Sequence, residues 1–309
     1  MFIDNLIDAI IKYNTRVCCG LDPRIKEIEE KYKTVARYWI PPSLVRENVE
    51  KYGKAKGRAK AVEDFVGRLV HTVDPHVAVY KPNIAYFEAL GKHGLGALKQ
   101  TIDIIHETGK MAILDAKVSD IGPSALHYGI AFFEYLQVDA VTLNPYLGSD
   151  TIKVLLDNFV KGERGIFVLC KTSNPSSKDF QDKKVHNRPL FEVVAEKIKE
   201  WGSQFKGSKG WSEIGAVVGA TYPQQLKRLR KKLNDSFFLI PGLGIQGGKP
   251  EDVARFGTNE DGLGAIFNSS RGINYAYQKL GYPEEDWLDA AEEQASTLKE
   301  KINAAIGKR

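Results

Sequence analysis

Three charged residues directly follow the apolar stretch 111–114, in the sequence MAILDAKVSDIG. Asp115 and Lys117 are two positions apart, so in an extended strand their side chains point the same way. An ammonium group held beside carboxylates stays protonated, because opposite charges favour the charged form. Such a lysine can donate a proton and bind an anion. Asp120 lies beyond the predicted strand, in a loop. A purely structural ion pair is the alternative interpretation.

Two segments near the end of the chain have the composition of a phosphate-binding site. The segment PGLGIQGG (241–248) is rich in glycine, and FNSSRG (267–272) contains Ser270 and Arg271. Backbone N–H groups in such turns bind phosphate oxygens, and an arginine can add a bidentate contact. Together the two segments predict that the protein binds a small phosphorylated molecule.

Eight short apolar segments are predicted to be the strands that position these residues. They are residues 17–22, 77–81, 111–116, 140–144, 165–170, 214–219, 237–242 and 264–270. Their nearly continuous apolar character is typical of parallel strands that are buried on both faces. Segments with the periodicity of amphipathic helices separate them, at 95–110, 190–202, 223–234 and 284–306. The chain is therefore predicted to have an α/β fold with a parallel sheet.

Eight strands that alternate with helices favour a closed (β/α)8 TIM barrel. We expect residues 1–309 to form a single domain, with residues 23–75 as an extended, charged crossover between the first two strands. A doubly wound open sheet is the alternative. That fold would place a glycine-rich phosphate turn after an early strand, and the sequence has none there.

Nearly every predicted strand ends in polar residues at its carboxyl end, which is the end of a barrel that carries the active site. These residues are Asp22, Lys81, Asp115, Asn144, the segment 171–174, Gln246 and Arg271. A single aspartate at a strand end commonly caps the next helix, but capping does not account for the whole set. The pattern predicts a barrel enzyme that acts on a small phosphorylated molecule through a cluster of lysines and aspartates.

Composition argues against several other classes of protein. The chain has 44 basic and 39 acidic residues, and its net charge of +5 is not concentrated in any block, so we expect no binding to nucleic acid. No apolar stretch approaches the roughly 18 residues needed to cross a membrane, and the N-terminus lacks a basic signal-peptide region. The histidines lack zinc-site spacing, so we expect no metal. Cys18, Cys19 and Cys170 lie in apolar segments and are predicted to be buried thiols in a reducing cytoplasm.

Six segments resemble, in the same order, the orotidine 5′-phosphate decarboxylase family. They are GLDPR (20–24), YKPNIAYFE (80–88), LDAKVSDIG (114–122), VLCKTSNPSS (168–177), IPGLGIQGG (240–248) and SSRGI (269–273). The long first crossover and the CKTSNP sequence resemble the longer-chain branch. The resemblance implies a homodimeric barrel with shared active sites. It further implies decarboxylation of orotidine 5′-phosphate to uridine 5′-phosphate, in pyrimidine biosynthesis, without a cofactor or metal.

The resemblance also implies catalytic roles for four residues. Lys117 corresponds to the proton donor to C6 of the pyrimidine, and Asp115 lies beside the departing carboxylate. Lys81 joins them in an alternating array of charges. Asp120 completes the array in the active site of the partner subunit.

A second set of residues is implied to bind the nucleotide. Asp22 would hold a ribose hydroxyl, and Ser124 would reach the ribose in the partner's site. Ser173 would contact the pyrimidine ring. Pro175 would be the first residue of the mobile loop that closes over substrate. The residues implied at the phosphate end are Gln246, Ser270 and Arg271.

Two alternatives to this function remain open at the level of sequence. The DxKxxD pattern is shared with magnesium-dependent sugar-phosphate decarboxylases and aldolases of the same suprafamily, and inhibition by EDTA would favour those. A phosphate-binding barrel without catalytic activity is the other. It is disfavoured because Lys81, Asp115, Lys117 and Asp120 are all present.

Overall fold

The computed structural model describes residues 1–32, 38–161, 163–242 and 250–307. Eight parallel strands close a barrel in the order β1-β10-β9-β8-β5-β4-β3-β2, and β6 and β7 pair as a separate hairpin. The strands are β1 (Val17–Leu21), β2 (Val79–Pro82), β3 (Met111–Val118), β4 (Ala140–Leu143), β5 (Gly165–Lys171), β6 (Lys184–Val185), β7 (Arg188–Pro189), β8 (Ser212–Val218), β9 (Ser236–Pro241) and β10 (Ala265–Ser269).

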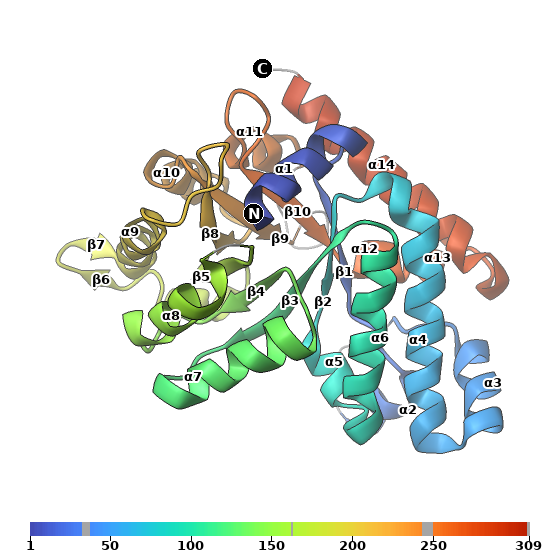
Figure 1. Cartoon of the computed structure of the whole chain (residues 1–309). Helices are drawn as coiled ribbons and strands as arrows, with labels where there is room; N and C mark the ends of the chain where they lie inside the picture. Colours follow the sequence, from blue (N-terminus) through green and yellow to red (C-terminus); the bar gives the residue numbers. More distant parts are fainter. Residues whose placement is uncertain (33–37, 162, 243–249, 308–309) are drawn as a thin grey trace. The chain divides into compact units, whose positions relative to one another are not determined.

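Helices follow most of the strands (Figure 1). The α-helices are α1 (Phe2–Tyr13), α2 (Lys26–Glu29), α3 (Pro42–Tyr52), α4 (Lys54–Val73), α5 (Ile84–Glu88), α6 (Gly94–Glu107), α7 (Gly122–Gly129), α8 (Ser149–Leu155), α9 (Leu190–Gly202), α10 (Pro223–Lys232), α11 (Pro250–Gly257), α12 (Arg271–Asn274), α13 (Ala276–Leu280) and α14 (Trp287–Gly307). Short 3-10 helices are η1 (Asp74–His76), η2 (Gly91–His93), η5 (Pro175–Asp179) and η6 (Glu284–Asp286). Two π-helical segments are η3 (Ile130–Tyr135) and η4 (Leu156–Val160).

The architecture confirms the predicted (β/α)8 barrel, and the open-sheet alternative is wrong. All eight predicted strands form, and the crossover between β1 and β2 contains α2, α3 and α4. Contacts within the chain divide it into two compact units, one of residues 1–16, 116–268 and 300–309 and one of residues 17–115 and 269–299. The single-domain organisation stays a prediction.

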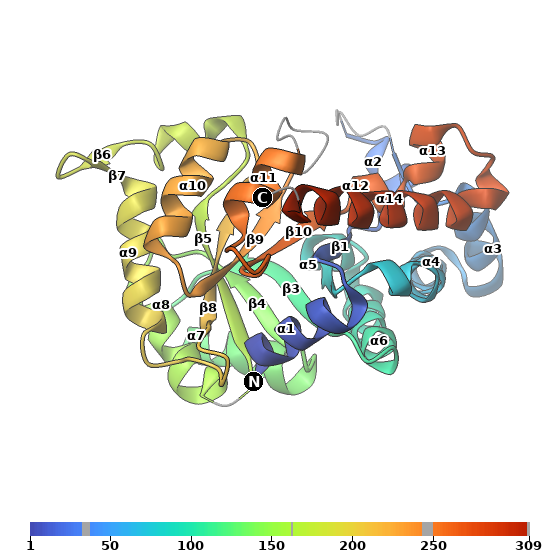
Figure 2. The ribbon, with the colours of Figure 1, turned by 90° about the horizontal axis from the view of Figure 1, so that it is seen from above.

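The unit that contains residues 116–268 is built around the parallel strands β4, β5, β8 and β9. Phe2 of α1 is buried and packs edge to face on Phe167 of β5, with 6.0 Å between ring centroids. Trp211 and Phe237 make a second such contact, at 4.9 Å. Hairpin β6–β7 lies beside α9, and α10 packs along α9 (Figure 2). Burial of these rings stabilises the packing of this unit.

The unit that contains residues 17–115 pairs β1 with β2 and β2 with β3. Helices α3 and α4 pack closely, because Gly57 lies against the backbone of Asn48 and leaves no room for a side chain. On another face of α4, Phe65 stacks on Trp287 of α14 at 4.8 Å between centroids. The crossover between β1 and β2 is therefore packed on its neighbours by apolar contacts.

Candidate active site

A buried ion pair joins the carboxyl ends of β2 and β3. Lys81 Nζ donates a hydrogen bond to Asp115 Oδ2 at 2.6 Å, and the two residues are only 4% and 7% exposed. Burial alone would lower the pKa of Lys81, but the carboxylates of Asp115 and Asp22 outweigh it and raise that pKa above its ordinary value. Lys81 is thus a fixed positive charge beside Asp115. The structure brings together these two predicted catalytic residues.

The backbone at Asp22 is held by residues that follow β10. Asn274 donates from Nδ2 to the Gly20 carbonyl at 2.8 Å, and its Oδ1 accepts from the Asp22 N–H at 3.1 Å. The Tyr275 hydroxyl donates to the Asp22 carbonyl and accepts from the Arg24 N–H at 2.9 Å. These contacts fix the end of β1 against the start of α12. Asn274 and Tyr275 were not predicted from the sequence. They directly follow the segment SSRGI (269–273), and their ability to form hydrogen bonds could have marked them as candidates.

Ser270 and Arg271 lie at the start of α12, in the same unit as Asp22. The Ser270 carbonyl accepts from the Asn274 N–H at 2.9 Å, and the Arg271 residue is exposed. Burial and the charge of Asp22 raise the pKa of Tyr86, and the positive charge of Arg271 opposes this shift. Asp22, Tyr86 and Arg271 therefore share one electrostatic environment. The predicted phosphate ligand Gln246 lies outside the described residues.

Lys117 belongs to the other unit, and its backbone is unusual. Its φ of 51° is in the left-handed region, which costs a non-glycine residue about 1–2 kcal/mol. The Lys117 N–H donates to Thr142 Oγ1 of β4 at 3.0 Å, and the residue is exposed. β3 extends beyond the predicted end at residue 116 and includes Lys117. The left-handed backbone at Lys117 interrupts the regular alternation that would point its side chain the same way as that of Asp115. Thr142 was missed, although a threonine inside the apolar segment AVTLN is a visible signal.

Asp120 and Ser124 follow β3 and line one open hollow of about 600 Å³. Asp120 lies in the loop before α7, and its Oδ1 accepts from the Ile121 N–H at 2.8 Å. Ser124 is exposed in the first turn of α7. The other residues that line the hollow are Pro123, His127, Tyr128 and Ala131. The structure thus places these two predicted residues on a common exposed surface.

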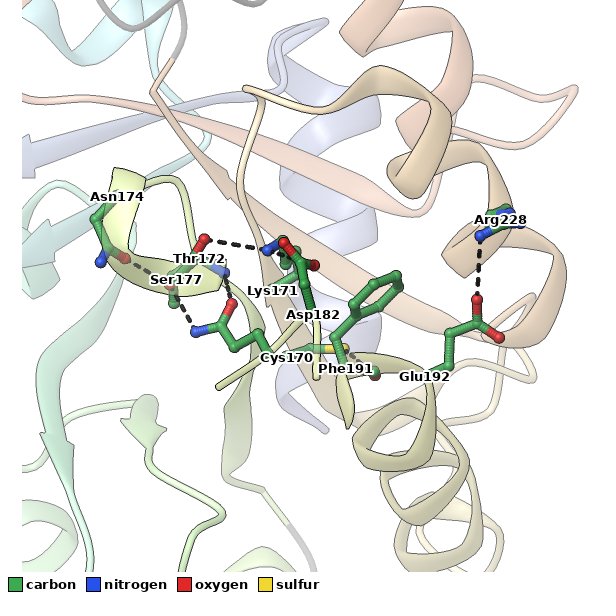
Figure 3. Close-up of polar contacts among 10 residues, drawn as sticks. Cys170, Lys171, Thr172, Asn174, Ser177, Asp182, Phe191, Glu192 and Arg228 are labelled. Carbon is green, nitrogen blue, oxygen red and sulfur yellow. Dashed lines mark hydrogen bonds and ion pairs between the residues drawn. The ribbon is translucent and has the colours of Figure 1, made fainter. Parts of the chain in front are cut away.

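Ser173 follows β5 and is held from two sides. A side chain at Gly219, just after β8, would come within 2.8 Å of the Ser173 Cα, so only glycine permits this approach. Thr221 Oγ1 donates to the Ser173 carbonyl at 3.4 Å. Pro175 is exposed and begins η5, where its fixed φ suits the first helical position. Figure 3 shows the polar contacts of this segment, from Lys171 to Asp182.

Three further properties of the described residues bear on the kind of protein. Within residues 1–32, 38–161, 163–242 and 250–307, no group of three or more His, Cys, Asp or Glu side chains is placed to hold a metal ion. In the same part of the chain, no helix is both long and apolar enough to cross a membrane. Cys18, Cys19 and Cys170 are buried, as predicted, and form no disulfide.

Comparison with known proteins gives consistent matches over the length of the chain. The family described as orotidine 5′-phosphate decarboxylase / HUMPS matches residues 15–281. An orotidine 5′-phosphate decarboxylase of Caldicellulosiruptor bescii is 38% identical over 315 aligned residues, which cover 99% of each chain. The structure of the Leishmania donovani OMP decarboxylase superposes with a TM-score of 0.75, at 30% identity over 99% of this chain and 98% of that one. The Plasmodium berghei orotidine 5′-monophosphate decarboxylase, at 22% identity, shares the fold with a TM-score of 0.79 over 100% of this chain and 99% of that one.

Proposed function

Because the chain belongs to the orotidine 5′-phosphate decarboxylase / HUMPS family, we propose that it is the carboxy-lyase that converts orotidine 5′-phosphate to uridine 5′-phosphate in pyrimidine biosynthesis. The observation that carries the proposal is the buried Lys81–Asp115 pair, with Lys117 two residues further along β3. A positive charge fixed beside a carboxylate, followed by a lysine that is exposed to solvent, supplies the groups that the reaction needs.

In the proposed mechanism, the bond between C6 and the carboxylate carbon breaks and carbon dioxide leaves. The electron pair remains on C6 of the pyrimidine, where resonance gives little relief, so the site has to lower the barrier by roughly 20 kcal/mol. Lys117 stabilises the developing negative charge and then transfers a proton from its ammonium group to C6. Asp115 lies beside the substrate carboxylate, and Lys81 holds Asp115 in place by its hydrogen bond. Solvent then returns a proton to Lys117.

An ultraviolet assay tests this function directly. Protein mixed with orotidine 5′-phosphate and EDTA should consume the orotate chromophore at the same rate as without EDTA. Loss of activity in EDTA would favour a magnesium-dependent sugar-phosphate reaction of the same suprafamily. Lys117→Ala should lower kcat by at least about four powers of ten, since it removes both a proton donor and a charge. Lys92→Ala, at an exposed lysine in η2, is the control and should be as active as the parent.

Retention of more than about a tenth of the parent's kcat by Lys117→Ala would contradict the proton-donor role. Such a variant should fold normally, because the Lys117 side chain is not part of the core. Thermal unfolding of the variant and the parent checks this point.

The remaining predicted residues are proposed to bind the nucleotide. Asp22 accepts a hydrogen bond from a ribose hydroxyl, and Ser173 contacts the pyrimidine ring. Pro175 is the first residue of the loop that closes over the substrate. The fixed backbone at Asp22 and Ser173 supports these roles, because binding groups act best when they are held in place before the substrate arrives. The residues proposed at the phosphate end are Gln246, Ser270 and Arg271.

We further propose that two copies of the chain share their active sites. Asp120 and Ser124 line an open hollow, and apolar side chains are exposed in the same stretch of chain, at Ile121, Tyr128 and Tyr135. A second copy that covers this surface would bury these apolar side chains and would receive Asp120 and Ser124 in its own active site.

Complementation between inactive variants tests the shared site. Lys117→Ala and Asp120→Ala should each be nearly inactive as pure dimers. In a mixed dimer, one site draws Lys117 from one chain and Asp120 from the other and is fully native. Refolding equal amounts together makes about half the dimers mixed, so roughly a quarter of the parent's activity should return. Demonstrated heterodimers without recovered activity would show that Asp120 acts within its own chain.

We propose that the enzyme works in the cytoplasm and that residues 1–309 form one domain. The three buried thiols form no disulfide, which supports a reducing compartment, because oxidising compartments favour disulfides.

A further inference from the structure

Lys171 is a buried cation at the carboxyl end of β5, and the mechanism above gives it no role. The residue is 1% exposed. Pairing of β5 with β8 shifts in register between Leu169 and Lys171, so Cys170 is an extra residue in the strand. Such a bulge redirects the side chain that follows it. A buried ammonium group is costly unless it is paired, so the position has to be stabilised by specific partners.

The partners of Lys171 come mainly from the segment that follows it (Figure 3). Lys171 Nζ donates to Ser177 Oγ at 3.1 Å and to Asp182 Oδ1 at 2.9 Å, six and eleven residues further along the chain. The ammonium group also lies 5.1 Å from the ring centroid of Tyr222 and 5.8 Å from that of Phe191, within the range of cation–π attraction. The buried ammonium group of Lys171 therefore holds residues 177 and 182 against the end of β5.

A second set of hydrogen bonds closes the same segment. Gln181 Oε1 accepts from the Thr172 N–H, and Gln181 Nε2 donates to Thr172 Oγ1, both at 2.8 Å. Thr172 Oγ1 donates in turn to Asn174 Oδ1 at 2.6 Å. The Gln181 N–H donates to the Ser177 carbonyl at 2.9 Å. Residues 172–182 are thus a closed loop whose two ends are tied together.

Ser173 lies inside this closed loop, between Thr172 and Asn174. We propose that Lys171 is a positioning residue. By binding Ser177 and Asp182 it keeps the two ends of segment 172–182 tied together, and so it presents Ser173 to the pyrimidine ring of the substrate. This inference rests on the proposed role of Ser173. Because Lys171 itself is buried, its removal should affect the reaction only through the loop.

Lys171→Met tests the inference, because methionine keeps an unbranched side chain and removes the charge. The control is Lys232→Met, since Lys232 Nζ pairs with Glu192 at 3.5 Å and Glu196 at 3.1 Å, on the outer side of α9. Amide hydrogen exchange should accelerate in peptides that cover 172–182 in Lys171→Met alone. In that variant kcat/KM for orotidine 5′-phosphate should fall about tenfold or more, whereas Lys232→Met should stay within about twofold of the parent.

A double-mutant cycle with Ser173→Ala separates positioning from general loss of structure. If Lys171 acts through Ser173, the double variant should be about as impaired as the worse single variant. Lys171→Met should also weaken binding of uridine 5′-phosphate and leave binding of ribose 5-phosphate, which has no pyrimidine ring, unchanged. Losses in kcat/KM that multiply, or equal weakening of both ligands, would overturn the inference and leave the proposed function standing.

Two further results keep the test decisive. If Lys171→Met fails to fold, Asp182→Ala replaces it, since the Asp182 side chain is 36% exposed and its removal leaves Ser177 to bind Lys171. Asp182→Ala should show the same changes in hydrogen exchange and ligand binding, with a smaller loss of kcat/KM, about threefold. If its loss and that of Ser173→Ala multiply in the double variant, the inference is again overturned. Ser173→Ala with unchanged kcat/KM would overturn the role of Ser173 and, with it, the positioning role of Lys171.

Discussion

We expect Glu213→Gln to stabilise the protein at pH 8 and to change its stability much less at pH 5. Glu213 is in β8 and is 1% exposed. Its Oε2 accepts from the Ile3 N–H at 3.0 Å, and within the described residues its Oε1 has no hydrogen-bond partner. Burial raises the pKa of Glu213 to about 7, against opposing effects of the Ile3 N–H and the N-terminal charge, while Asp4 adds to the increase.

The size and sign of the effect follow from this pKa. The folded state holds the proton up to about pH 7, and the unfolded chain releases it near the ordinary value of 4.5. Between these two pH values the folded state binds more protons, so its stability falls as the pH rises. At about 1.4 kcal/mol for each pH unit, ionisation costs about 3 kcal/mol by pH 8. For a chain of this length that corresponds to roughly 5 °C in Tm.

Thermal unfolding of the parent and Glu213→Gln at pH 5 and pH 8 is the assay. The amide oxygen of glutamine can still accept from the Ile3 N–H, so the variant loses only the charge. Glu107→Gln, at an exposed glutamate in α6, is the matched control and should have the Tm of the parent at both pH values. A change in Tm that is the same at pH 5 and pH 8 would refute the explanation based on the raised pKa.

Two further predictions concern arginines. Arg271→Ala should weaken binding of orotidine 5′-phosphate by about 2–3 kcal/mol, as loss of a charged contact does, and should leave binding of orotidine, which lacks the phosphate, unchanged. Equal weakening of both ligands in a titration would exclude a phosphate contact. Arg230→Met should lower the free energy of unfolding by about 3 kcal/mol, because the guanidinium group satisfies buried backbone acceptors. These acceptors are the carbonyls of Leu233, Ser236, Gly257 and Gly264. A urea midpoint equal to that of the parent would contradict this.

The barrel could be predicted from the sequence because its strands carry a local signature. A parallel strand that is covered on both faces has to be apolar at nearly every position, and each of the eight segments shows this. The predicted helix at 190–202 matches α9 at both ends for a similar reason, since the apolar positions of an amphipathic helix recur every three or four residues. Some of the predicted site residues, such as Asp22, Lys81 and Asp115, depended on the same local signature, because polar residues at the end of an apolar segment are visible in the chain itself. The roles of these residues, and the choice of Ser124 and Pro175, came from the resemblance to a known family.

The contacts that hold those residues in place depended on the tertiary structure. Lys171 was visible as a polar residue at a strand end, but its burial and its pairing with Ser177 and Asp182 follow from the bulge in β5 and the closure of the loop. The left-handed backbone at Lys117 likewise has no signature in the residue type. Glu213 meets the Ile3 N–H from 210 residues away. Sequence determines which residues can form strands and ionise, whereas burial, which sets their pKa values and partners, arises only when distant segments pack together.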